Sequence, residues 1–123
     1  MSDKNLPLVY SCSGCSDVAQ LANTLALRLN QQGLAEMSCI SGVGGKVPAL
    51  VKAARSGRRI LALDGCALQC SHACLQQVGV EPDLHVRLHE QGFRKHYDQL
   101  YSNEEQEQAW QVLLQILQDD EQC

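Results

Sequence analysis

Short apolar runs alternate along this chain with segments in which apolar residues recur at helical spacing. Four strands are predicted, at residues 6–12, 35–41, 58–65 and 84–90. The last of them alternates apolar and polar positions, as a half-exposed edge strand does. Helices are predicted between and after the strands, at residues 17–33, 48–57, 70–79 and 103–120.

Local signals support these helix boundaries. Ser16 or Asp17 caps the first helix, Gly33 ends it, and Pro48 lies in the first turn of the second helix. The last helix has an apolar face formed by Trp110, Leu113, Leu114 and Leu117. The β-α-β-α-β-α-β-α order predicts an α/β fold: a small three-layer, Rossmann-like or flavodoxin-like domain. Its sheet is mainly parallel and four-stranded, with helices on both faces.

Composition narrows the class of protein. The 123 residues, 45% hydrophobic and 20% charged, fit a single domain over residues 1–123. The net charge is −4, and residues 104–123 hold six acids and no base, so we expect the last helix to present a solvated acidic face. Nothing is basic enough to indicate nucleic acid, and no apolar run is long enough to span a membrane. The first residues lack a secretory apolar segment, which predicts a cytoplasmic protein.

Seven cysteines in a reducing compartment favour metal binding or thiol chemistry over a disulfide framework. In a parallel sheet, the loops that follow the strands meet at one edge, and ligands bind there. Five thiols map to that edge, namely Cys12, Cys15, Cys39, Cys66 and Cys70. This convergence is the main functional inference from the sequence.

Clustered thiolates are typical ligands of zinc, which binds four of them tetrahedrally. Cys12 and Cys15 form a CxxC pair, and Cys66 and Cys70 lie one helical turn apart. Cys39 is a fifth candidate from the neighbouring strand. The spacing favours Cys15 over Cys39, but all five stay candidate ligands of a zinc ion.

Three blocks, YSCSGCSDVAQLAN, the run from Cys39 to Gly44 and LALDGCALQC, resemble the DGC-domain family of zinc-binding proteins. The family takes its name from the motif that is here Asp64-Gly65-Cys66, and the resemblance covers roughly residues 6–80. It implies four zinc ligands that match Cys12, Cys39, Cys66 and Cys70, with Cys15 as an additional thiol. The resemblance implies a bound metal but does not imply a reaction.

The remaining chemical residues have plainer interpretations. Three roles are open for Asp64. It is a turn residue that bonds to nearby backbone N–H groups, a residue that orients a metal ligand through a hydrogen bond, or a catalytic carboxylate beside the metal. Gly44, Gly45 and Lys46 form a weak candidate anion-binding loop. Core packing is expected of Cys74, and Cys123 is expected to be an exposed thiol. His72 follows the ligand loop and is a further candidate ligand, although a position on the helix surface is the more common case. His85, His89 and His96 are expected to face solvent.

Three classes of function stay open. The first is a non-catalytic zinc-binding module that acts through a protein partner. The second is a thiol–disulfide redox protein that uses the Cys12–Cys15 pair. The third is a metal-dependent hydrolase that uses Asp64. No nucleophile motif names a reaction, so whether the protein is an enzyme is left open.

Overall fold

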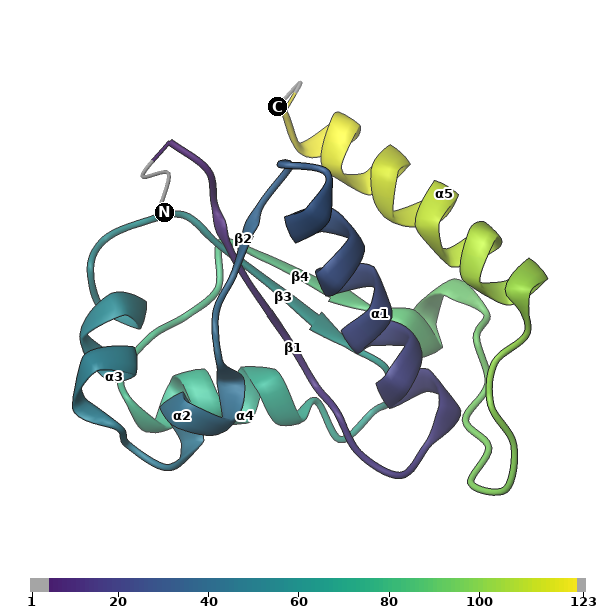
Figure 1. Ribbon diagram of the computed structural model, residues 1–123, viewed down its shortest axis with the longest axis horizontal. Coiled ribbons are helices and arrows are strands. Elements are labelled where there is room, and N and C mark those ends of the chain that lie inside the picture. Colours follow the sequence, from purple (N-terminus) through teal and green to yellow (C-terminus); the bar gives the residue numbers. More distant parts are fainter. Residues whose placement is uncertain (1–4, 122–123) are drawn as a thin grey trace.

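A four-stranded, all-parallel sheet forms the middle of the molecule (Figure 1), in a computed structural model that describes residues 5–121. The spatial order of the strands is β2-β1-β3-β4. Their bounds are Leu8–Ser11 for β1, Glu36–Met37 for β2, Ile60–Asp64 for β3 and Leu84–Arg87 for β4. Leu8 pairs with Ile60, and Leu61 pairs with Leu84, so the central strands are aligned at their starts. The predicted α/β class with a parallel four-stranded sheet is confirmed.

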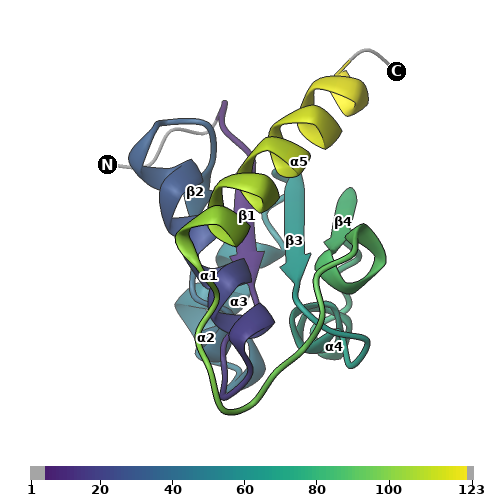
Figure 2. The same cartoon turned by 90° about the vertical axis from the view of Figure 1, so that its right-hand side faces the viewer.

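Helices cover both faces of the sheet, as expected for three layers. On one face lie α1 (Asp17–Gln31) and α5 (Asn103–Glu121), and Figure 2 shows α5 crossing in front of β1 and β3. On the other face lie α2 (Ile40–Gly44), α3 (Pro48–Ala54) and α4 (Cys70–Gln77). None of the helices within residues 5–121 combines the length and the apolar character that crossing a membrane requires.

Each face of the sheet has its own apolar core. The α1 leucines at positions 21, 25 and 29 are fully buried against Val9 and Leu61, which point to one face. Tyr10 and Ala62 point to the other face and pack with Val43 of α2 and Leu75 of α4. Burying one leucine stabilises a fold by roughly 2 kcal/mol. The alternation along β1 and β3 therefore fixes which helices lie on which side.

All four strands are shorter than predicted, and the two edge strands are followed by helical turns. The strand predicted at residues 35–41 ends at Met37, and the chain then turns into the short helix α2, which places Val43 in the core. The strand predicted at residues 84–90 ends at Arg87. A 3₁₀ turn, η1 (Leu88–Gln91), follows and ends at Gly92, whose φ of 93° suits glycine. Both errors lie where a strand at the edge of the sheet runs out of partners.

The acidic last helix is more than a solvated face. Glu107 forms an ion pair with Arg28 at 2.9 Å, and Asp120 pairs with Arg59. The Arg28 guanidinium also lies 4.3 Å from the centre of the Trp110 ring. Two acids of α5 thus pair with arginines elsewhere in the chain, and exposed pairs of this kind contribute about 0–1 kcal/mol each.

Gly65 marks the point where the end of β3 approaches the first turn of α1. A Cβ atom at this position would lie 2.8 Å from the Ala19 nitrogen and closer still to the Val18 carbonyl. Both neighbours are backbone atoms of a helix, so neither is able to move aside. Only glycine permits this contact between the two segments that follow β1 and β3.

Gly65→Ala is therefore expected to destabilise the protein by roughly 3 kcal/mol, at the upper end for overpacking a tight site. Urea denaturation followed by circular dichroism measures the change. Gly14→Ala is the matched control, because a Cβ at Gly14 meets nothing within 4 Å. Equal stabilities of the two variants would contradict the close approach.

Candidate functional site

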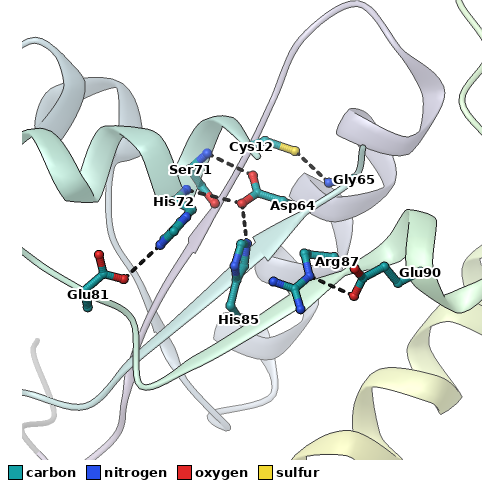
Figure 3. A network of polar contacts seen from close by, with 9 residues as sticks. All are labelled: Cys12, Asp64, Gly65, Ser71, His72, Glu81, His85, Arg87 and Glu90. Atoms are coloured by element: carbon teal, nitrogen blue, oxygen red, sulfur yellow. Dashed lines mark hydrogen bonds and ion pairs between the residues drawn. The ribbon is translucent and has the colours of Figure 1, made fainter. Parts of the chain in front are cut away.

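Cys12 continues β1 beyond its last paired residue and lies at the carboxyl edge of the sheet. Its N–H donates to the Leu63 carbonyl at 3.0 Å, which keeps it beside β3. Its Sγ accepts a hydrogen bond from the Gly65 N–H at 3.1 Å (Figure 3). The side chain is buried, and this burial raises the pKa of the Cys12 thiol to about 12. Cys12 is therefore a protonated thiol at neutral pH in this structure.

Four of the five predicted thiols line one cavity of about 140 Å³ at this edge. Cys12 and Cys15 come from the loop after β1, and Cys66 and Cys70 come from the loop after β3 and the start of α4. Cys12 is buried, Cys66 is half-buried, and Cys15 and Cys70 are exposed. The structure thus brings together two thiol pairs that are more than 50 positions apart in the sequence.

The thiols share the cavity without forming a finished coordination shell. Within residues 5–121, no three side chains of His, Cys, Asp or Glu are arranged as a group that holds a metal ion. The donors suit zinc in kind, because thiolates are its preferred soft ligands. Cys15 and Cys70 are exposed, so their side chains are able to change rotamer without disturbing a core.

Cys39 and Cys74 lie outside the lining of this cavity. Cys39 directly precedes α2 and is exposed, so it is not the core residue that a strand position would have made it. Cys74 is half-buried on α4, and its Sγ lies against Gly44 of α2, in keeping with the packing role expected of it. Burial raises the pKa of the Cys74 thiol. Cys123 lies outside the described residues.

Asp64, the last residue of β3, is fully buried and fastens three segments together (Figure 3). Its carboxylate accepts hydrogen bonds from the backbone N–H groups of Ser71 at 2.9 Å and His72 at 3.3 Å. It therefore caps α4, whose preceding residue Gln69 has a left-handed φ of 55° and makes no side-chain cap. Cys70, the first residue of α4, is placed by this contact.

The third partner of Asp64 is His85 on β4, whose Nε2 lies 2.7 Å from the carboxylate. The His85 ring also lies 4.8 Å from the ring of His72, which in turn contacts Glu81 at 2.9 Å. The prediction that His85 faces solvent was wrong, since its side chain is only 11% exposed. Strand alternation placed it on the polar side of β4, where a buried carboxylate occupies the position expected for water.

A second buried carboxylate, Asp17, holds the segment between η1 and α5. Its N–H donates to the His96 carbonyl at 2.9 Å, while its Oδ1 accepts from the His96 N–H at 2.6 Å and its Oδ2 contacts the His96 ring at 2.9 Å. The His96 side chain is 41% exposed, so it does face solvent as predicted, but the prediction missed its contact with Asp17. Burial works to raise the pKa of Asp17, but the hydrogen bonds from His96 and Val18 outweigh it and lower that pKa.

Residues 92–102, which we call the strap, carry Lys95 to the thiol cavity. Lys95 lines the cavity, and its Nζ lies 3.6 Å from the Sγ of Cys66. A hydrogen bond with Tyr97, together with the Cys66 thiol, raises the pKa of Lys95, which is therefore a cation. Sequence reasoning missed Lys95, because the strap has no periodicity or motif that points to a site 29 positions away.

The glycine loop shows little of an anion cradle. Gly44 ends α2, and the N–H groups of Gly45 and Lys46 donate to carbonyls of that helix at 2.9 and 3.0 Å. These two donors serve the end of the helix. The side chains of Lys46 and Arg55 line a shallow depression nearby. Anion binding here stays a prediction, and it would depend on these two side chains.

Fold and site together define a small parallel α/β protein with a thiol-lined cavity at the carboxyl edge of its sheet. The family model described as the DGC domain matches residues 8–113, and the chain belongs to this family. It is 56% identical over 115 residues to the "Anaerobic and virulence modulator AnvM" of Pseudomonas aeruginosa strain PAO1, covering 94% of this chain and 88% of that protein. No solved structure matches the chain significantly.

The contact between Asp17 and His96 predicts an acid-sensitive contribution to stability. Above the ordinary aspartate pKa of 3.8 the carboxylate is charged in both states, and its hydrogen bonds favour the folded one. Asp17→Asn is expected to cost about 2 kcal/mol at pH 7, the usual range for hydrogen bonds to a charged group. The difference from the wild type should shrink as the pH falls below about 4, through the lowered pKa of the folded protein.

Urea denaturation of both proteins between pH 7 and pH 3 measures this difference. Asp98→Asn, at an exposed position of the strap, is the control and should track the wild type. A deficit of Asp17→Asn that stays constant down to pH 3 would show that charge at Asp17 is irrelevant to folding.

Proposed function

We propose that this protein binds one zinc ion through the thiolates of Cys12, Cys15, Cys66 and Cys70, and acts as a non-catalytic module. The observation that carries the proposal is that these four thiols, from two distant loops, line a single cavity. A bound zinc ion would tie the loop after β1 to the loop after β3, and four thiolates would leave it no open position for a substrate.

The chain's own residues supply the parts such a site needs. Cys12 is held by the Gly65 N–H, so one ligand is fixed before a metal arrives. Asp64 caps α4 and thereby sets the position of Cys70. Lys95 brings a positive charge beside Cys66, where it offsets part of the negative charge of a four-thiolate site.

Two observations weigh against the catalytic alternatives. Both oxygens of Asp64 accept hydrogen bonds inside the protein, and the residue is fully buried, so it is poorly placed to attack a substrate or activate water. Cys12 and Cys15 share their cavity with Cys66 and Cys70, and a redox pair formed by Cys12 and Cys15 would not require those two further thiols. The relative is named a modulator, which suits a module that acts through a partner.

Elemental analysis of protein purified without added metal tests the proposal. We expect about one zinc per chain, with four thiols becoming titratable when a chelator removes it. Cys70→Ser should lose most of the zinc, because it removes one of the four ligands. Cys74→Ser, one helical turn further along α4 and outside the cavity, is the matched control and should keep it. Metal-free protein with all thiols reactive would refute zinc binding.

A second pair of variants decides the fourth ligand. The geometry favours Cys15, which lines the cavity, over Cys39, which does not. Cys15→Ser is therefore expected to lower the zinc content and Cys39→Ser to preserve it. The reverse result would support the ligand set implied by the family resemblance, and would require the start of α2 to move toward the cavity.

A further inference from the structure

Lys95 is the cation of the thiol cavity. Among the residues that line this cavity only Asp64 and Lys95 carry charge, and the Asp64 carboxylate is buried with its oxygens hydrogen-bonded to Ser71, His72 and His85. The ammonium group of Lys95 lies 3.6 Å from the Sγ of Cys66. A small molecule that approaches Cys66 through the open side of the cavity therefore meets a positive charge beside the sulfur.

The backbone beside Lys95 is held in place by the fold. His96, the next residue, is bound by Asp17 through both its backbone groups and its ring. Further along the strap, the hydroxyl groups of Tyr101 and Thr24 lie 2.5 Å apart. The Lys95 ammonium also lies 4.8 Å from the centre of the Tyr97 ring, which limits where it points.

We propose that Lys95, positioned by the contact between Asp17 and His96, makes the thiol cavity selective for small anions that approach the Cys66 sulfur. The ligand class is a low-molecular-weight anion, such as a carboxylate. Where it carries an electrophilic carbon beside its charge, the sulfur–carbon bond forms as the bond from carbon to its leaving group breaks, and the thiol proton passes to solvent. The inference rests on the same cavity as the proposed zinc site, but it concerns recognition of a second molecule and is measurable with or without metal.

Two alkylating reagents that differ in charge test the selectivity. Iodoacetate is an anion and iodoacetamide is neutral, yet both form the same bond between sulfur and carbon and release iodide. The rate at Cys66 is measured for each reagent by peptide mass spectrometry, on the full chain as purified and again after chelation. Dividing the two rates cancels differences in exposure and in protection by a metal.

Lys95→Gln is expected to lower the ratio of iodoacetate to iodoacetamide rates at Cys66 roughly fivefold, as expected for losing one charge about 4 Å away in a water-exposed site. Lys95→Arg should restore most of the ratio. Lys52→Gln, which removes a lysine of α3 outside the cavity, should leave the ratio unchanged. The ratios should also fall with added salt in the wild type and not in Lys95→Gln.

The positioning role has its own variant. Asp17→Ala leaves Lys95 in place in the sequence but frees the strap, so it should lower the ratio in the same direction as Lys95→Gln. A thermal melt run alongside shows whether the variant is folded at the temperature of the assay. A ratio at Cys66 that is the same in wild type and Lys95→Gln would overturn the inference, whether or not the protein binds zinc. If Lys95→Gln lowers the ratio in a protein that binds no zinc, the inference about Lys95 holds although the proposed zinc site does not.

Discussion

A buried carboxylate must be given hydrogen-bond donors, and at the end of β3 this requirement organises the carboxyl edge of the sheet. Asp64 finds its donors at the start of α4 and in the ring of His85 on β4. Without the carboxylate, the first turn of α4 would lack a cap, because Gln69 provides none. The thiols of Cys66 and Cys70 lie in the segment that Asp64 fastens at both ends, so their placement follows from this constraint.

The loop after β1 uses the same arrangement. Asp17 begins α1, is buried, and takes its donors from the backbone and ring of His96 in the distant strap. In each case an aspartate at or before a helix start binds a histidine from the second half of the chain, and a thiol pair lies beside it. The two loops that carry the thiols are thus fixed independently, and Gly65 brings them into contact, because it lets the end of β3 approach α1. Assembly of the cavity therefore depends on three residues that are not thiols.

The sequence was informative where its signals are local. Apolar runs located the four strands, and the order of strands and helices was enough to bring Cys12 and Cys66 to one edge. Prediction from the sequence failed where the position of a side chain depends on a partner that is distant in the sequence. Alternation along β4 correctly predicted which face His85 points to. It could not reveal that the Asp64 carboxylate lies on that face and binds the His85 ring. Lys95 lies in a strap without periodicity, so only the folded chain shows that it reaches the cavity.

The four thiols of the cavity are unequal, and this inequality bears on how such a site works. Cys12 is buried and protonated, whereas Cys15 and Cys70 are exposed and face solvent at the rim. On the zinc proposal, the metal would meet the exposed thiols first and would bind Cys12 only as that thiol lost its proton. Cys66 lies between these extremes, half-buried and beside the ammonium of Lys95. If the cavity holds zinc as proposed, the ion would find Cys12 already held by the Gly65 N–H, and the two exposed thiols would close around it by changing rotamer.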